Sequence, residues 1–357
     1  MNAKERYLAV YDEDKRKTLD RVPTFVQYIK EDFIALHKDI LLEKYQSKLF
    51  NNLYFDIPLI FGFDSIFASM TTSYKVRRVT VRDNEGNRVK IGIDGQTRRK
   101  STYYEGGFIQ SLDTLNDLRA NLKIVNRSTQ IVQMAEYFES LSPYIFPVPT
   151  LDGIFDKVWQ AMGFSLFSRE FRKKTKLYQE LIKFYAEIIE INLEGIIEAT
   201  KGRLNIINIL DDVAFKGRPM ISPASWERDF MPYYKKITAI ISDAGMISQT
   251  HTDGDVTQLV PSLQKAGFRG LQGWEGGADP YFINDNYPDF VIVGFGDVSE
   301  ILPFGSSSQI QNHVKTLMDA LKENRHFILG PSTVIVKEMP LENIQAFMNA
   351  AKKYGNY

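Results

Sequence analysis

One of the four histidines in this chain of 357 residues stands among acidic residues. The stretch THTDGD, residues 250–255, places Asp253 two positions after His251, and Glu275 follows a short apolar run, in GWEGG. An imidazole and two carboxylates would form an oxygen-rich ligand set, which zinc accepts but does not require. Each residue also has a simpler interpretation: a hydrogen-bonded core histidine, a turn-forming aspartate before Gly254, and an acidic side chain in a surface loop.

Polar residues follow several short apolar runs in the second half of the chain. Those at or just after the ends of the runs are Asp211, Asp212, His251, Asp253, Glu275, Asp297 and Ser332. The runs alternate with helical patterns, which predicts a parallel sheet. Five such runs without a change of composition favour one (β/α)8 barrel of the TIM type over two small domains. Because the carboxyl ends of barrel strands converge on the face that carries active sites, we expect these side chains to share a site.

The first half of the chain is less regular. Residues 21–28 predict the first strand. Residues 74–107 alternate as antiparallel strands do, with turns at 84–87 and 94–95. We therefore predict an α/β protein with a single barrel domain over residues 1–357. The β-hairpin insertion would leave the barrel and cover its mouth.

Composition excludes several classes of function. The 44 basic residues balance the 44 acidic ones, so neither nucleic acid nor an anionic membrane is an expected partner. The absence of cysteine excludes disulfides, iron–sulfur clusters, thiolate zinc sites and cysteine nucleophiles. The first residues are too charged for a signal peptide, and no long apolar run follows, so a cytoplasmic location is expected.

Several stretches resemble the uroporphyrinogen decarboxylase superfamily. Residues 211–237 begin with Asp-Asp and continue through Ile-Ser-Pro to Pro-Tyr, in the family's order. Residues 251–267 resemble its His-x-Cys-Gly segment and the helix that follows. Residues 302–321 and 327–355 resemble its closing strand–helix units, and LDRVPTF, residues 19–25, resembles its opening strand. The resemblance implies a (β/α)8 barrel, as the alternation already indicates.

Two departures from the family narrow the activity that the resemblance implies. Uroporphyrinogen decarboxylases carry an arginine-rich loop after the first strand, whereas residues 26–39 contain no arginine. A porphyrinogen with several negative charges needs several fixed cations, so we predict no uroporphyrinogen decarboxylation. The thiol-methylating members hold zinc through cysteines, but this chain has Asp253 at the first cysteine position and Ser332–Thr333 near the second. A soft zinc site that ionises a thiol is therefore not expected.

What remains resembles the methyltransferase components of corrinoid-dependent demethylases, also in residues 81–95 and 103–112. This resemblance implies an enzyme that takes a methyl group from a small donor, such as a methyl ether, and passes it to cob(I)alamin. A separate corrinoid protein would carry that acceptor, because the chain lacks an Asp-x-His-x-x-Gly motif. The expected partners are the corrinoid protein and the small-molecule methyl donor, and a homodimer is left open.

Cob(I)alamin is a strong nucleophile, so the poor leaving group is the difficult part of such a transfer. A Lewis acid or a general acid addresses that difficulty. We predict that His251 and Glu275 act together at the barrel mouth, and that His251, Asp253 and Glu275 hold a metal ion, zinc among the candidates.

Asp211 and Asp212 are adjacent, so in an extended strand their side chains point in opposite directions. One is expected to face the pocket as a further catalytic residue, and the other to cap the next loop or pair with Arg218. The predicted substrate contacts are Asp64, Phe215, Trp274 and Ser332, and Trp159, Tyr103 and Tyr104 could extend an aromatic wall.

Two other functions stay open on the sequence alone. The first is a decarboxylase or lyase of the same superfamily that acts on a smaller acid than uroporphyrinogen. The second is a non-catalytic barrel that binds a small molecule. Retention of a metal would favour the methyltransferase, activity without metal or corrinoid would favour the lyase, and an inert pocket would favour the binding protein.

Overall fold

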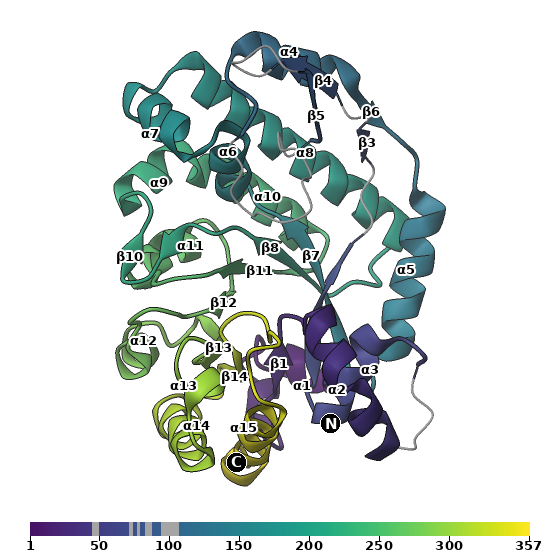
Figure 1. Ribbon diagram of the computed structural model, residues 1–357, viewed down its shortest axis with the longest axis vertical. Coiled ribbons are helices and arrows are strands. Elements are labelled where there is room, and N and C mark those ends of the chain that lie inside the picture. The colour runs from purple at the N-terminus through teal and green to yellow at the C-terminus, as the bar shows by residue number, and fades with distance from the viewer. Residues whose placement is uncertain (45–49, 71–73, 77–78, 83–87, 94–106) are drawn as a thin grey trace.

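Eight parallel strands form the central sheet of the molecule (Figure 1). The computed structural model describes residues 1–44, 50–70, 74–76, 79–82, 88–93 and 107–357. In the order in which they pair, the strands are β1 (Phe25–Val26), β2 (Ser65–Ser69), β7 (Phe146–Asp152), β8 (Ile206–Leu210), β11 (Ile247–Thr252), β12 (Gly270–Gly273), β13 (Val291–Gly296) and β14 (Phe327–Pro331). A parallel bridge between Thr24 and Leu329 brings the first and last strands together. The sheet is thus a nearly closed barrel, and the predicted (β/α)8 fold is confirmed.

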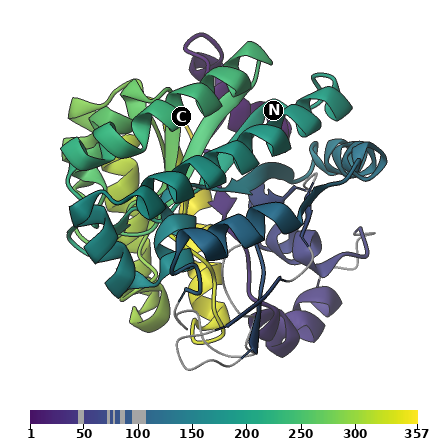
Figure 2. The ribbon, with the colours of Figure 1, turned by 90° about the horizontal axis from the view of Figure 1, so that it is seen from above.

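Helices surround the barrel (Figure 2). They are α1 (Ala3–Ala9), α2 (Glu31–Lys44), α3 (Leu53–Phe61), α4 (Leu112–Asn121), α5 (Ser128–Leu141), α6 (Phe155–Met162), α7 (Phe164–Lys173), α8 (Lys176–Thr200), α9 (Pro223–Asp229), α10 (Met231–Asp243), α11 (Val260–Lys265), α12 (Pro280–Asn286), α13 (Ile301–Phe304), α14 (Ser307–Leu321) and α15 (Leu341–Tyr354). Two short 3-10 helices, η1 (Lys15–Thr18) and η2 (Thr257–Leu259), complete the set of described helices. None of the helices in the described ranges is long and apolar enough to cross a membrane.

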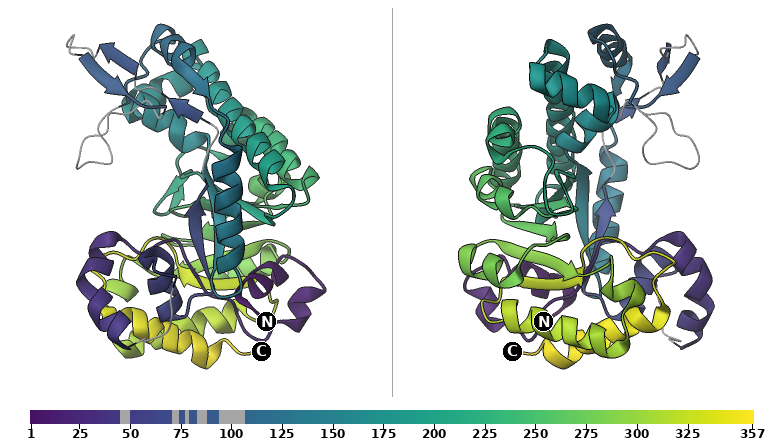
Figure 3. Two further views of the ribbon diagram at one scale, coloured as in Figure 1. Left: turned by 90° about the vertical axis from the view of Figure 1, so that its right-hand side faces the viewer. Right: turned by 60° about the vertical axis from the view of Figure 1, so that its left-hand side comes forward.

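The chain leaves the barrel between β2 and β7. Here β4 (Val79–Arg82) pairs antiparallel with β5 (Arg88–Ile91), and β3 (Tyr74–Val76) pairs antiparallel with β6 (Leu122–Ile124). Figures 1 and 3 place these strands near α4, at the end of the molecule away from both termini. The β4–β5 pair lies within the predicted hairpin insertion. Two predictions lie outside the described residues. These are the turns at 84–87 and 94–95, and Tyr103 and Tyr104 of the predicted aromatic wall.

Two helices, α9 and α10, follow each other directly between β10 and β11. Ser222 caps α9, since its hydroxyl accepts a hydrogen bond from the Ser225 N–H, and Pro223 occupies the first turn. The division falls at Phe230, whose φ of −116° departs from the value of about −63° in a regular helix. Pro232 follows in the first turn of α10, where the missing N–H of a proline costs no helical hydrogen bond. Pro232 therefore lies at the start of a second helix and does not interrupt a longer one.

The sequence pattern did not reveal β7, FPVPTLD, because two of its residues are prolines. A proline cannot donate to a sheet ladder and is rare in central strands. Pairing with β8 begins only at Thr150, after Pro147 and Pro149. The missing N–H groups therefore lie before that ladder begins, while β7 still pairs with β2 over 146–150.

The interior of the barrel changes from apolar to polar toward the carboxyl ends of the strands. One cluster of buried apolar side chains combines residues of α1 with residues of the barrel strands. Tyr7 and Tyr11 reach the interior, and both hydroxyls donate to Gln249 Oε1. Gln249, Gln272 and His251 are buried polar residues of β11 and β12. Because buried polar groups must be paired, this layer fixes the orientation of the side chains above it.

Candidate functional site

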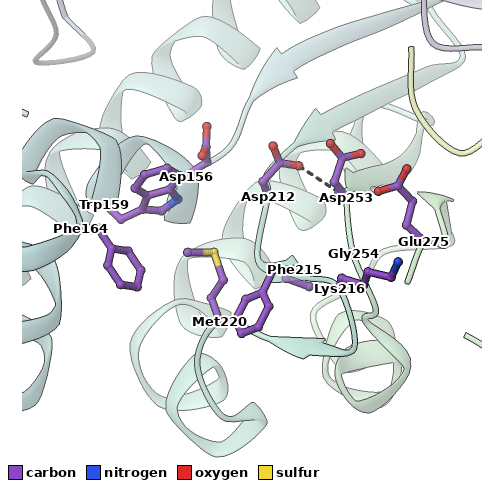
Figure 4. A pocket seen from close by; sticks show the side chains of 11 residues that line it. Asp156, Trp159, Phe164, Asp212, Phe215, Lys216, Met220, Asp253, Gly254 and Glu275 are labelled. Carbon is purple, nitrogen blue, oxygen red and sulfur yellow. Dashed lines mark hydrogen bonds between the residues drawn. The ribbon is translucent and has the colours of Figure 1, made fainter. Parts of the chain in front are cut away.

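A cavity of about 380 Å³ opens at the carboxyl ends of β8, β11 and β12. Figure 4 shows its carboxylates along one side and its rings and a methionine on the other. The lining residues are Asp156, Trp159, Phe164, Asp212, Ala214, Phe215, Lys216, Met220, Asp253, Gly254 and Glu275. Of the predicted site residues, the cavity thus brings together Asp212, Asp253, Glu275 and Phe215, beside the predicted aromatic wall residue Trp159.

His251 lies at the base of the carboxylate row, with 1% of its surface exposed. Its Nδ1 contacts Gln272 Oε1. The Gln272 amide has one possible orientation, because its Nε2 donates to the carbonyl oxygens of Pro331 at 3.2 Å and Ser332 at 2.8 Å. Its oxygen must therefore accept the hydrogen bond, so His251 Nδ1 carries the proton. In the neutral imidazole, Nε2 then presents a lone pair.

That lone pair faces two carboxylates. His251 Nε2 lies 3.4 Å from Asp253 Oδ1 and 3.7 Å from Asp212 Oδ1. Asp253 Oδ1 is buried and has no hydrogen-bond partner among the described residues. The pKa of Asp253 is raised to about 6, chiefly by burial, and the charges of Asp212 and Glu275 act in the same direction. A lone pair and two acids that converge in this way are stabilised by a cation or a proton between them.

The three residues fit a metal ion. One ligand atom from each of Asp212, His251 and Asp253 lies within 4.8 Å of the others. Metal-ligating histidines commonly donate their second ring N–H to an oxygen acceptor, which here is Gln272 Oε1. The donor set of one nitrogen and carboxylate oxygens suits zinc and harder divalent ions. Asp212 takes part in this group in place of Glu275, which the sequence suggested as the third ligand.

Glu275 lies at the end of the next strand, beside the three-residue group. Its Oε1 accepts a hydrogen bond of 2.9 Å from the Ser332 hydroxyl. Ser332 itself is 2% exposed and is absent from the cavity lining. The predicted substrate contact at Ser332 is therefore better described as a positioning contact, through Glu275 with its hydroxyl and through Gln272 with its carbonyl oxygen.

Asp211 and Asp212, which follow the end of β8, point in different directions. Asp212 lines the cavity and accepts a hydrogen bond of 3.0 Å from the Asp253 N–H. Asp211 is fully enclosed and accepts from the N–H groups of Phe155 and Asp156, which begin α6, and from the Tyr234 hydroxyl. Burial raises the pKa of Asp211 to about 7. Asp211 thus holds the start of α6 instead of facing the cavity, and it does not pair with Arg218.

Two glycines allow a short hairpin to lie over the cavity. The hairpin consists of β9 (Ala214–Phe215) and β10 (Arg218–Pro219), which pair antiparallel. A Cβ atom on Gly254 would lie 2.7 Å from the Ala214 carbonyl carbon, and one on Gly276 would lie 2.8 Å from Lys216 Cα. Both glycines also have positive φ values, +87° and +71°. The hairpin can therefore place Phe215 and Lys216 against the mouth of the cavity (Figure 4).

Two predicted substrate contacts lie elsewhere. Asp64 precedes β2 at the amino end of the barrel strands, where it accepts hydrogen bonds from Arg6, Arg21 and Thr24. A buried carboxylate that two guanidinium groups hold at the opposite end of the strands cannot contact a substrate in this cavity. Trp274 is 3% exposed, stacks on Phe295 at 5.4 Å between ring centroids and donates to the Leu271 carbonyl. It is a core residue, so both of these predictions are corrected.

Some residues of the site were missed in the sequence. Asp156 lines the cavity from the first turn of α6, just beyond β7. Its signal was the same as that of the other acids, a position after a strand end, but the prolines of β7 concealed the strand. Gln272 had no comparable signal, because a glutamine inside an apolar run shows its role only through its partners. Lys216 and Met220 follow the Asp-Asp pair in a loop whose shape the sequence pattern did not indicate.

Comparison with known proteins assigns the chain to a family. Residues 150–354, more than half of the 357 residues, match the model of the family described as uroporphyrinogen decarboxylase (URO-D). The chain belongs to the uroporphyrinogen decarboxylase family. The resemblance stated from the sequence motifs is thereby confirmed. No curated protein matches the chain.

Solved structures show the fold shared by this uroporphyrinogen decarboxylase family member. A methyltransferase from Methanosarcina mazei matches with a TM-score of 0.63 and 17% sequence identity, over 99% of each chain. A sugar phosphate isomerase/epimerase from Parabacteroides distasonis matches with a TM-score of 0.33 and 10% identity, over 92% of this chain and 94% of that chain. The first similarity shows a common barrel fold, and the second is too distant to support an argument.

The cavity of this uroporphyrinogen decarboxylase family member is acidic. Four carboxylates line it, and Lys216 is the one basic side chain among the lining residues that the structure describes. Figure 4 shows the Lys216 ammonium group near Glu275 at one end of the row. Such a lining repels anions and attracts cations or neutral groups that can donate hydrogen bonds.

Proposed function

We propose that the protein is a methyltransferase that moves a methyl group from a small donor, such as a methyl ether, to a corrinoid carried by a partner protein. The observation that supports this proposal most directly is the convergence of His251 Nε2 with the carboxylates of Asp212 and Asp253. These residues would hold a divalent cation, with zinc as one candidate. Such a cation, when bound, supplies a Lewis acid that polarises the oxygen from which the methyl group leaves.

The neighbouring residues would orient the reacting groups. Gln272 fixes the tautomer of His251, so that Nε2 faces the cavity. The Ser332 hydroxyl holds Glu275 at the end of the carboxylate row, where the carboxylate can accept a hydrogen bond from the substrate or pass a proton to it. In the transfer, the C–O bond breaks, the oxygen keeps the electron pair, and the methyl group passes to the reduced corrinoid.

The charge of the cavity favours this function over decarboxylation. A substrate carboxylate would meet Asp156, Asp212, Asp253 and Glu275, with Lys216 as its one basic neighbour among the described lining residues. A metal-free lyase for a small acid would need at least one fixed cationic side chain directed at that carboxylate. Lys216 lies in an exposed turn at the mouth. Among the described residues, no hydrogen bond or ion pair holds its ammonium group toward His251 and its neighbours. A neutral methyl donor avoids this repulsion.

The proposal is tested with the purified protein, candidate methyl ethers and free cob(I)alamin, whose loss on methylation is followed in a spectrophotometer. His251→Ala and Glu275→Ala are each expected to lower the rate by about 10²-fold or more, the scale usual for groups that act on proton transfer. His251→Ala is also expected to lose bound metal, because the imidazole is the one nitrogen donor of the group.

Asp297→Asn is the matched control, because Asp297 also follows a barrel strand but caps a turn through the Ser299 and Glu300 N–H groups. It should keep both metal and rate. Wild-type metal content and activity in both site variants would refute the proposal. Methyl transfer by a metal-free protein at the wild-type rate would refute the Lewis-acid role.

A further inference from the structure

Helix α6 presents a carboxyl group and an aromatic ring to the cavity, and both are nearly buried. Asp156 and Trp159 are three residues apart, so they share one face of the helix. Asp156 is 6% exposed and Trp159 is 9% exposed, whereas Phe164 and Phe215, which line the same cavity, are 58% and 44% exposed. The Asp156 carboxyl group and the Trp159 ring are therefore enclosed, although exposed Phe164 lies beside Trp159, with 6.4 Å between the ring centroids.

The fold holds Asp156 firmly in this position. Its N–H donates to Asp211 Oδ1 at 2.7 Å, and both of its carboxyl oxygens lie 2.6 Å from Gln160 Nε2, one turn further along α6. Burial, together with the charges of Asp212 and Asp211, raises the pKa of Asp156 well above its usual range. In its protonated form, the carboxyl group both donates and accepts a hydrogen bond.

Figure 4 shows how the residues that line the cavity are arranged. Asp156 lies at one end of the carboxylate row beside Trp159, and Asp212 separates it from Asp253 and Glu275. Met220 and Phe215 lie on the opposite side. A flat apolar body between these sides would have Asp156 at one edge and the His251 group at another. Planar rings gain free energy from such apolar and aromatic contacts.

We propose that Asp156 is a specificity-determining residue, whose carboxyl group hydrogen-bonds a neutral hydroxyl or carbonyl oxygen on a planar substrate that packs against Trp159. This proposal adds a substrate preference to the proposed methyl transfer. It rests on the proposed function only for the methyl ether group of the substrate. An anionic group would meet the whole carboxylate row. A cationic group would need Asp156 in its ionised form, next to Asp211 and Asp212.

Binding of defined probes to the metal-loaded protein tests this selection. The probes are methoxybenzene, its three hydroxylated forms (2-, 3- and 4-methoxyphenol) and benzyltrimethylammonium, with affinities measured by calorimetry. At least one methoxyphenol should bind about tenfold more tightly than methoxybenzene, the scale of one additional hydrogen bond to a buried group. Benzyltrimethylammonium should bind more weakly than that isomer.

Two substitutions of the same residue separate shape from hydrogen bonding. Asp156→Leu should abolish the preference for the hydroxylated probe, while Asp156→Asn should keep it, because an amide also donates and accepts. Asp152→Asn is the matched control, since Asp152 lies just before α6 but pairs with Lys157 and does not line the cavity. It should behave as the wild type. Melting temperatures verify that each variant is folded. If Asp156→Leu does not fold, the preference measured in Asp156→Asn still tests the proposal.

Several results would overturn the proposal. These are equal affinity of the wild type for all neutral probes, failure of every probe to bind, a preference that survives Asp156→Leu, or loss of the preference in Asp156→Asn. If benzyltrimethylammonium binds more tightly than every methoxyphenol, Asp156 selects a cation and not a neutral oxygen, and the proposal is wrong. If no methyl ether reacts but the preference behaves as expected, the proposed reaction fails and the selection by Asp156 stands. If methyl transfer proceeds and the preference does not depend on Asp156, the reverse holds.

Discussion

Replacement of Gln272 by leucine should separate the stability of the barrel from the affinity of the candidate metal group. Gln272 is 0% exposed and contacts no solvent or cavity. It accepts from His251 Nδ1 and donates to the carbonyl oxygens of Pro331 and Ser332. Leucine has a similar size but offers none of these hydrogen bonds. His251 would then lose the contact that keeps its Nε2 lone pair toward Asp212 and Asp253.

The hydrogen bonds set the expected magnitudes. A buried donor left without a partner costs about 1–3 kcal/mol, so the unpaired Nδ1–H alone should lower the free energy of unfolding by that amount. Loss of the partner that orients a metal-ligating histidine typically weakens metal binding about 10- to 100-fold. That range corresponds to about 1.4–2.8 kcal/mol of binding free energy.

Gln249→Leu is the matched control for this substitution. Gln249 is also 0% exposed and also contributes to the polar layer, with hydrogen bonds to Tyr7, Tyr11 and Asn208. Urea unfolding should show that both variants are less stable than the wild type. Competition with a chelator should show that only Gln272→Leu has lost metal affinity. Wild-type metal affinity in Gln272→Leu, or an equal loss in Gln249→Leu, would refute the role assigned to Gln272.

Three further predictions follow from the same structure. The purified protein should produce no coproporphyrinogen from uroporphyrinogen in an anaerobic assay, because Lys216 is the one basic side chain among the described residues that line the cavity. Asp64→Ala should lower the free energy of unfolding by about 1–3 kcal/mol, since buried Arg6 loses one of its two carboxylate partners and keeps Asp20, but should not change the KM for a methyl donor; a raised KM would restore Asp64 as a substrate contact. Burial lowers the pKa of His326 below its unfolded value, so its contribution to stability is present above about pH 6.5 and is lost as the pH falls through the folded pKa. The difference in unfolding free energy between wild type and His326→Gln should therefore shrink from about pH 7 to about pH 5, as measured by urea unfolding at each pH, and a growing difference would contradict this.

The fold was predictable where each strand and helix has a clear pattern. The last five barrel strands, β8, β11, β12, β13 and β14, are short apolar runs that alternate with helices, and the structure places all five in one parallel barrel. The β7 strand escaped because Pro147 and Pro149 interrupt the pattern that defines a central strand. Its register with β8, which begins only at Thr150, depends on the neighbouring strand and cannot be read from the heptapeptide itself.

The candidate site was predictable where it depends on strand ends. Asp212, Asp253 and Glu275 follow consecutive strands of the second half, and all line one cavity. The choice between Asp211 and Asp212 required the structure, because alternation shows that the two side chains diverge but not which one faces inward. Asp64 and Trp274 were misplaced because the amino end of a strand and a buried ring leave the same trace in a sequence as a site residue does.

The polar layer inside the barrel explains why the site depends on residues with no signal of their own. Carboxylates at strand ends can each be hydrated when they point apart. When Asp212, Asp253 and Glu275 converge, their mutual repulsion must be overcome. Gln272 and Ser332 supply that constraint, since one amide fixes His251 and one hydroxyl fixes Glu275, and the Ser332 carbonyl oxygen accepts from the same amide. The last strand thus controls the orientation of groups on two earlier strands. It follows that Ser332→Ala should release the Glu275 carboxylate, although it removes no carboxylate of the row and leaves the backbone carbonyl oxygens that hold Gln272.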